Sequence, residues 1–332
     1  MPIFAPATWF LYAIHQRGEE ISGVAADYTG QMIALQVTGL YFQCLATAET
    51  RRILEAQHAA AAALMKEVDA YHGEGMVTDG DRAQVQVLLL ARENALELNA
   101  RALDRCKAEL LEAMGLSPTA EIQLDGAAMM NKPEGELQDW ILDALLHHPR
   151  LAIADRLVEI EKEKTRIAIS DFLPMLAGFA ARSHTSNSFM AFPYVSAMGF
   201  TGLMTLFNGF ANVNEYLAAR TQQEKAYLAR EQESLALMLQ VVRAHSRLAD
   251  AEAQLKLARA AAEAAKVKLK EETAKMHEGL LRPSEMLNVV AQHDAAQVNA
   301  ANAQYQQQVM AAIACNVLGA TWRGHKDENN EQ

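Results

Sequence analysis

The sequence is poor in aromatic residues, proline and cysteine, and each shortage narrows the range of folds. Aromatic residues make up 6% of the 332 residues and proline occurs 8 times, whereas alanine is abundant. This composition favours helices packed at short range over a bulky globular core. The three cysteines, Cys44, Cys106 and Cys315, are isolated, without a CxxC motif or a second metal ligand nearby. We therefore expect three buried or neutral thiols and neither a disulfide framework nor a metal site.

Basic stripes, long apolar runs and catalytic motifs are also missing. The formal net charge of -11 argues against a nucleic-acid partner. No run of 18 apolar residues exists, which excludes a spanning α-helix but not the weakly alternating strands of a barrel. Without a Ser/His/Asp arrangement, a glycine-rich phosphate loop or HExxH, neither an enzyme nor a cofactor is supported. His147 and His148 precede Pro149 without further ligands and indicate a helix end.

The chain contains one segment twice. Gly75 opens GMVTDGDRA and Gly115 closes LLEAMG, while Gly279 opens GLLRPSEML and Gly319 closes CNVLG. The two glycines are 40 positions apart in each copy. Each copy combines a glycine turn, a long helix-compatible run and a second glycine where the helix can stop. Each copy is predicted to be the descending arm of a helical hairpin.

The duplication extends towards the N-terminus, where the offset between the two copies changes by one residue. Residues 45–49 (LATAE) match residues 248–252 (LADAE) at an offset of 203, which places the opening MPIF on MTLF at 204–207. Residues 137–203 of the second unit have no counterpart ahead of Met1. We therefore expect that the sequence begins partway through its first unit. A chain of that kind would have lost its signal peptide, and none is recognisable here.

Helical periodicity is clearest in the second copy. Residues 211–278 contain neither glycine nor proline, and the returning arm from Met286 to Val317 has the same periodicity. Alternating steps of three and four form a heptad seam, and its many alanines require a close partner helix. We predict that the two arms pack against each other as an antiparallel hairpin. The seam of the first arm consists of Val241, Ala244, Leu248, Ala251, Leu255, Ala258, Ala262, Ala265 and Leu269.

Strands are predicted only where this periodicity disappears. Residues 175–182 (MLAGFAAR) and 194–209 (YVSAMGFTGLMTLFNG) mix small and large side chains and flank a polar HTSNS loop, which indicates a strand pair. Ile3 to Tyr12 look like the exit of another strand. Long helices are expected at 19–72 and 81–114, and shorter ones at 137–146 and 151–170. Irregular structure is expected between Gly115 and Gly135.

This order of elements resembles the TolC-like outer membrane factors, the outer membrane efflux protein family. The resemblance rests on residues 145–176 (LLHHPRLAIADRLVEIEKEKTRIAISDFLPML), MTLFNG, the tips GMVTDGD and GLLRPSE, and the ends LLEAMG and CNVLG. It implies a mainly α fold of long antiparallel coiled-coil hairpins in two repeats. A β-hairpin would contribute to a trimeric outer-membrane β-barrel, and the helices would lie in the periplasm. This sequence has one complete strand pair where the family has two.

The resemblance also implies a division of the chain. Residues 1–115 would form a truncated first repeat, 116–148 an equatorial linker, 149–319 the second repeat and 320–332 a disordered tail. The implied function is the exit duct of a tripartite efflux pump or type I secretion system, conducting passively and gated at its periplasmic tips. Its partners would be two sister chains, a periplasmic adaptor, an inner-membrane transporter and outer-membrane lipid.

A soluble coiled-coil adaptor or scaffold is the alternative function. In that case residues 174–209 would form only a linker or a small sheet. Solubility without detergent would favour the scaffold, whereas a β signal in the membrane fraction would favour the channel.

In the resembled family, the hairpin tips bind the adaptor through a short segment that begins with the turn glycine. Any tight hairpin also needs a glycine that can adopt positive φ, so the glycines alone do not distinguish docking from turn formation. The corresponding positions are Gly75, Met76, Val77 and Thr78 in the first copy, and Gly279, Leu280, Leu281 and Ser284 in the second.

The family closes its tunnel with inward acidic residues six and nine positions after the turn glycine. Those positions carry Asp81 and Gln84 in the first copy and Glu285 and Asn288 in the second. The resemblance thus implies a periplasmic gate at Asp81, Glu285 and Asn288, whose acidic ring would concentrate cations. The helix dipole is an equally sufficient reason for acids in a first turn.

Overall fold

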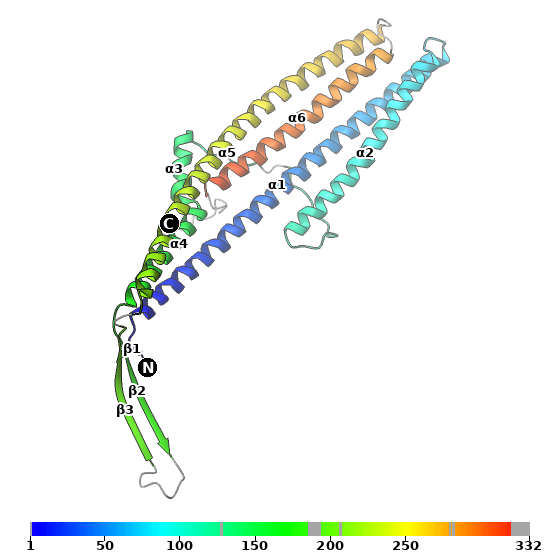
Figure 1. The fold of residues 1–332 in the computed structure, drawn as a ribbon. Coiled ribbons are helices and arrows are strands. Elements are labelled where there is room, and N and C mark those ends of the chain that lie inside the picture. The colour runs from blue at the N-terminus through cyan, green and yellow to red at the C-terminus, as the bar shows by residue number, and fades with distance from the viewer. Residues whose placement is uncertain are drawn as a thin grey trace, which may run out of the picture. The chain divides into compact units, whose positions relative to one another are not determined.

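The computed structural model describes residues 2–126, 129–184, 194–205, 208–278, 280 and 283–319 (Figure 1). The chain is divided into two compact units. Unit 1 contains the described parts of Met1–Thr29 and Asp143–Leu239, and unit 2 those of Gly30–Leu142 and Gln240–Gln332. The elements in chain order are β1 (Pro2–Phe4), α1 (Pro6–Gly73), α2 (Asp79–Ala113), α3 (Leu137–His147), α4 (Pro149–Ser170), β2 (Met175–His184), β3 (Tyr194–Leu203), α5 (Ala211–His277) and α6 (Pro283–Val317).

The helices confirm the predicted fold class, which is mainly α with long hairpins and one β-hairpin. α5 continues without a break for 67 residues, as the absence of glycine and proline predicted. α1 has 68 residues and begins well before the expected start. The prediction that Ile3 to Tyr12 form the exit of a strand is wrong beyond Phe4. Pro6 begins α1, because proline at a first helical position lacks only an N–H that would have no partner there.

No helix within the described part of the chain has both the length and the apolar character needed to cross a bilayer.

Unit 1 contains the sheet, in the order β1-β2-β3. β2 and β3 pair antiparallel from Met175 opposite Leu203 to His184 opposite Tyr194, which confirms the predicted strand pair. Most of the predicted HTSNS loop lies outside the described residues, as do 320–332. Phe179 stands opposite Gly199, and a Cβ added to that glycine would lie 3.0 Å from the Phe179 ring. The glycine therefore makes room for an aromatic ring across the ribbon.

Ion pairs hold α4 in unit 1 between the first part of α1 and the first part of α5. Each pair joins an arginine to a carboxylate on a different helix, so α4 is fixed on two sides. The pairs are Arg17–Glu159 at 2.7 Å, Arg156–Glu20 at 2.5 Å, Arg150–Glu233 at 2.6 Å and Arg230–Asp155 at 2.8 Å.

Unit 2 contains the two helical hairpins, α1 with α2 and α5 with α6 (Figure 1). The predicted seam faces the partner helix, since all nine seam residues of α5 are buried or half-buried. Arg259 reaches Gln304 at 3.3 Å and Lys268 reaches Gln292 at 3.2 Å, which joins α5 to α6. The antiparallel hairpin predicted from the heptad steps is confirmed.

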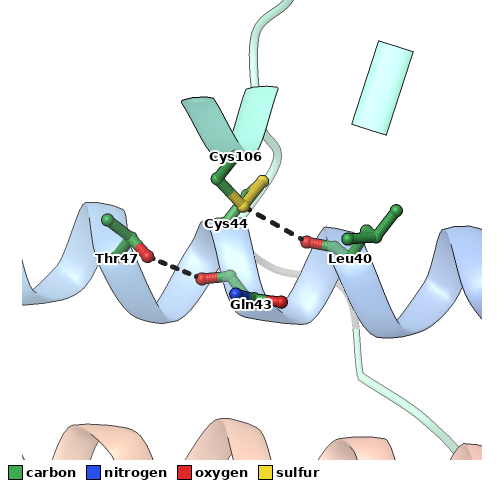
Figure 2. Close-up of a disulfide and its surroundings, with 5 residues drawn as sticks. All are labelled: Leu40, Gln43, Cys44, Thr47 and Cys106. Atoms are coloured by element: carbon green, nitrogen blue, oxygen red, sulfur yellow. Dashed lines mark hydrogen bonds between the residues drawn. A yellow bond between two sulfur atoms is a disulfide. The ribbon is translucent and has the colours of Figure 1, made fainter. Parts of the chain in front are cut away.

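Cys44 on α1 and Cys106 on α2 form a disulfide, with their Cα atoms 5.6 Å apart (Figure 2). The expectation of three buried or neutral thiols without a disulfide is therefore wrong for Cys44 and Cys106, which are buried but bonded to each other, whereas Cys315 is free. Both disulfide cysteines are 31 positions from Gly75, one before it and one after it. Because the two arms of an antiparallel helical pair rise equally per residue, the two side chains reach the same level of the hairpin.

Candidate functional site

The first hairpin turns at a glycine that ends α1. Gly75 has φ 75°, its N–H donates to the carbonyl of His72 at 3.0 Å, and Met76 N–H donates to Tyr71 at 2.9 Å. A bond from a residue back to the fifth residue before it, across a left-handed glycine, is a Schellman cap. The turn glycine thus satisfies the last carbonyl groups of α1 and reverses the chain.

Thr78 and Asp81 are held together at the start of α2. Thr78 is the N-cap: its hydroxyl accepts from Asp81 N–H at 3.1 Å and donates to the Asp81 carboxylate at 2.8 Å. Two predicted residues, one assigned to adaptor contact and one to the gate, therefore share a helix cap. Val77 is half-buried, whereas Met76 is 70% exposed.

A histidine–aspartate contact and an ion pair, both missed by the sequence interpretation, link the two arms beside this turn. His72 Nε2 lies 2.7 Å from Asp79 Oδ1, and Arg82 Nε lies 2.7 Å from Asp69 Oδ1. The available sequence signal was the presence of complementary polar side chains at nearly equal distances before and after the turn glycine. Together with the caps, these contacts fix the backbone around Met76.

The second tip repeats one backbone hydrogen bond of the first. Leu280 N–H donates to the Lys275 carbonyl at 2.9 Å, the same five-residue step as Met76 to Tyr71, and Leu280 is 72% exposed. Gly279 and Leu281 lie outside the described residues. Ser284 belongs to the first turn of α6, but its side chain is not among those described.

The predicted gate residues all lie close to the starts of α2 and α6. Asp81 is half-buried within its helix cap. Glu285 and Asn288 are exposed, as is Gln84. Asp81 and Glu285 both lie in a first turn, where the helix dipole favours negative charge.

A buried polar cluster joins the two hairpins, and the sequence interpretation did not single it out. Arg92 Nη2 on α2 lies 2.6 Å from Asp294 Oδ2 on α6, and His293 Nδ1 lies 3.3 Å from the other carboxylate oxygen. Gln57 on α1 donates to the Asp294 carbonyl at 3.4 Å. Burial raises the pKa of the Asp294 carboxyl, against the opposing effects of Arg92 and His293. The sequence signal available for this cluster was the position of Asp294, an acidic residue next to the alanine-rich seam of α6.

The two histidines confirm the predicted helix end. His148 is buried and caps α4, its Nδ1 accepting from Arg150 N–H at 3.2 Å. His147 is the last residue of α3, and its Nδ1 lies 3.1 Å from the Asp143 carbonyl. Burial lowers the pKa of the His148 imidazole, and the Arg150 charge acts in the same direction.

Apolar side chains remain uncovered on the β2-β3 ribbon. Met198 is 86% exposed and Phe200 83% exposed, and Phe179 and Leu203 are also exposed. Cross-strand neighbours point to the same face of a ribbon, and consecutive residues to opposite faces. Because Phe179 and Phe200 stand opposite Gly199 and Gly178, the two aromatic side chains belong to opposite faces. The ribbon is therefore apolar on both faces.

Comparisons with known proteins agree with this architecture. The VceC outer membrane protein of Vibrio cholerae is 14% identical with a TM-score of 0.81, over 95% of this chain and 76% of VceC. The CmeC outer membrane channel of Campylobacter jejuni is 13% identical with a TM-score of 0.80, over 95% and 68%. The open-state MtrE outer membrane channel of Neisseria gonorrhoeae is 16% identical with a TM-score of 0.79, over 93% and 71%. No curated protein matches the sequence significantly.

At such identities the structural likeness establishes the fold, and the sequence match establishes the family. Residues 140–314, just over half of the chain, match the family model described as outer membrane efflux protein. That segment contains α4, the strand pair and most of the second hairpin. The chain belongs to the outer membrane efflux protein family.

Proposed function

We propose that this outer-membrane efflux protein is the passive exit duct of a tripartite efflux pump or a type I secretion system. It forms a homotrimer whose ribbons complete a barrel in the outer membrane and whose helices lie in the periplasm. The observation that carries this proposal is the ribbon of β2 and β3, with Met198 and Phe200 uncovered. A soluble scaffold would have no use for such a surface.

The ribbon supports assembly with sister chains. Two strands cannot close a barrel, and hydrocarbon does not tolerate unpaired strand edges. Lipid covers one apolar face of the ribbon, and other protein groups inside the barrel cover the second face, because an open water-filled lumen would not stabilise it. Strands from further copies supply the missing neighbours.

The helical hairpins support the same assembly. Large apolar side chains are exposed on α2 and α5, on faces that the single chain leaves uncovered. Packing against hairpins of sister chains would bury them and extend the helical wall. They are Val87, Leu90 and Leu98 on α2, and Leu257 and Val267 on α5.

The disulfide supports the periplasmic placement of the helices. Cys44 and Cys106 lie in the helical part of the chain. Structural disulfides persist in oxidising compartments such as the bacterial periplasm and are rare in the cytosol. This support does not depend on the family.

The two tips are proposed to dock the periplasmic adaptor. Met76 and Leu280 are exposed, while the backbone around Met76 is held by the Schellman cap, the His72–Asp79 contact and the Arg82–Asp69 ion pair. A rigid turn that presents an apolar side chain loses little entropy on binding. Binding of a purified adaptor tests this: Met76→Asp and Leu280→Asp should weaken it, whereas Asp250→Asn, an exposed change on α5 away from the tips, should not.

The gate is proposed to be an acidic constriction made by Asp81 and Glu285 from each of three chains, with Asn288 beside it. Glu285 is the better probe, because Asp81 also holds the cap of α2. In reconstituted protein, Glu285→Gln should reduce cation preference and alter single-channel current. Glu271→Gln, an exposed neutralisation on α5, serves as the matched control. Unchanged current and selectivity in Glu285→Gln would remove the acidic ring.

A further inference from the structure

The disulfide lies at the centre of an apolar platform on the first hairpin. Cys44, Cys106 and Leu110 are buried together, and Val37, Leu40 and Tyr41 of α1 pack around them. Figure 2 shows Cys106 Sγ beside the Leu40 carbonyl oxygen, 3.8 Å away, which a disulfide sulfur contacts without donating a proton. The platform is shared by two helices, so its shape depends on how α1 and α2 are held against each other.

The segment that follows α2 lies on this platform. We call the described residues 116–126 and 129–136 the connecting segment. Ile122 and Leu124 of the connecting segment pack against the cluster around the disulfide. Tyr41 of the platform donates its hydroxyl hydrogen to the carbonyl of Asp125. Apolar contact and a hydrogen bond thus converge within four residues of the connecting segment.

The connecting segment then binds the second hairpin. Met130 N–H donates to Gln308 Oε1 of α6 at 2.6 Å, and Gln308 is buried. The thiol of Cys315 donates to the Asn131 carbonyl at 3.5 Å, and Lys132 Nζ lies 2.7 Å from Glu252 of α5. Three successive residues therefore attach to α5 and α6.

The second hairpin has no disulfide at the equivalent level. Leu248 and Met310 are 31 positions before and after Gly279, as the cysteines are around Gly75. Leu248 is buried and Met310 half-buried, so an apolar pair takes the place of the covalent bond. Only the hairpin that carries the docked connecting segment is cross-linked.

We propose that oxidation of Cys44 and Cys106 controls docking of the connecting segment, and through it one of the two sets of contacts that attach the second hairpin to the first. The oxidant is a protein disulfide. One cysteine thiolate attacks it to form a mixed disulfide, and the other thiolate then displaces the oxidant. One S–S bond forms in this chain and one is lost from the oxidant, which leaves as a dithiol with the two electrons and two protons.

The physical reason is that reduction releases the two helices beneath the connecting segment. Two thiols cannot approach as closely as two bonded sulfur atoms, so the Cys44 and Cys106 side chains move apart and the covalent link between α1 and α2 is lost. Leu110 and Tyr41, on different helices, would then no longer be held covalently as one surface for Ile122 and Leu124. The hydrogen bonds from Tyr41 and Met130 would lose their packed surroundings.

Hydrogen exchange in the full-length protein, with and without the disulfide, tests this. We expect exchange in the connecting segment, including the Met130 amide, to be about tenfold faster in Cys44→Ser/Cys106→Ser than in the oxidised protein. Peptides around the first tip, residues 66–80, should be unchanged. Cys315→Ser is the matched control, because it removes a thiol but keeps the disulfide and a donor towards Asn131.

A second measurement covers the case in which the double variant does not fold. The folded wild-type protein is reduced with dithiothreitol, and free thiols are counted by alkylation while exchange is followed. The count should rise from one to three as the connecting segment loses protection. Three free thiols in the untreated protein, or equal exchange in the connecting segment before and after reduction, would overturn the proposal. This test uses purified protein and is independent of conduction.

Discussion

Arg92 and Asp294 belong to different hairpins, yet Nη2 of the arginine lies 2.6 Å from Oδ2 of the aspartate. Both side chains are largely buried, with 19% and 8% of their surface exposed. A buried ion pair is costly to desolvate, and it is most costly when only one partner is removed. This pair therefore makes the two hairpins of unit 2 depend on each other.

Single and double replacement of the pair should give opposite results. We expect Arg92→Met alone to lower the free energy of unfolding by about 3–5 kcal/mol, because it leaves the buried Asp294 carboxylate without its arginine partner. The double variant Arg92→Met/Asp294→Leu should lie close to wild type, since both charges are gone. Urea unfolding followed by the helical circular dichroism signal measures this. A harmless Arg92→Met variant would show that the Asp294 carboxylate is solvated and not buried.

Asp294 should also make stability depend on pH. Burial raises its pKa, so the folded protein holds the carboxyl proton more tightly than the unfolded chain does. The stability from the protonated form is present at low pH and is lost as pH rises through the raised pKa. Relative to Asp294→Asn, which does not titrate, wild type should be more stable at about pH 4 than at about pH 8. A pH-independent difference in unfolding free energy would contradict this.

His148 should contribute a pH dependence of the opposite sign. Its pKa is lowered by burial, so the unfolded chain takes up a proton first as pH falls. Its contribution is complete above about pH 6.5 and declines as pH falls from there through the lowered pKa. His148→Ala should cost about 1 kcal/mol through loss of the cap, whereas His148→Asn should keep a cap and remove the pH dependence. Thermal melting between pH 5 and pH 8 distinguishes the three proteins.

Gly199 and Phe179 should be coupled in ribbon assembly. A Cβ at position 199 would lie 3.0 Å from the Phe179 ring, so Gly199→Ala requires that ring to move. We expect fewer trimers of Gly199→Ala in the outer-membrane fraction, and recovery when Phe179→Leu is added. Gly126→Ala, which meets no atom within 4 Å, is the steric control. If Phe179→Leu did not restore the trimers, the contact between the ring and the glycine would not be the cause.

The long helices could be predicted because their signals are local. The absence of glycine and proline between Ala211 and His277, and steps of three and four along α5, define a helix and its buried face without knowledge of the rest. The turn at Gly75 is similarly local, since a left-handed glycine suffices to end α1. The order of these local elements also carried the family resemblance that residues 140–314 confirmed.

Other features depended on which residues meet across the chain. Cys44 and Cys106 are 62 positions apart and become neighbours only when the register of the hairpin is fixed by Gly75. The Asp294 carboxylate is buried against Arg92 of the other hairpin. A residue pattern within one helix does not contain that contact. The cap of α2 could have been predicted from the sequence, because a threonine followed three residues later by an acid, as at Thr78, is a known signature of a helix N-terminus.

Conduction by protein purified from outer membranes tests the central claim most directly. Reconstituted in a planar lipid bilayer, the protein should produce discrete, ohmic current steps. Phe200→Asp, which places a charge on the exposed ribbon, should abolish those steps and reduce recovery from the membrane fraction while the helical circular dichroism signal remains. A wild-type protein that inserts into the bilayer but never conducts, or one that stays in the soluble fraction without detergent, would contradict the account.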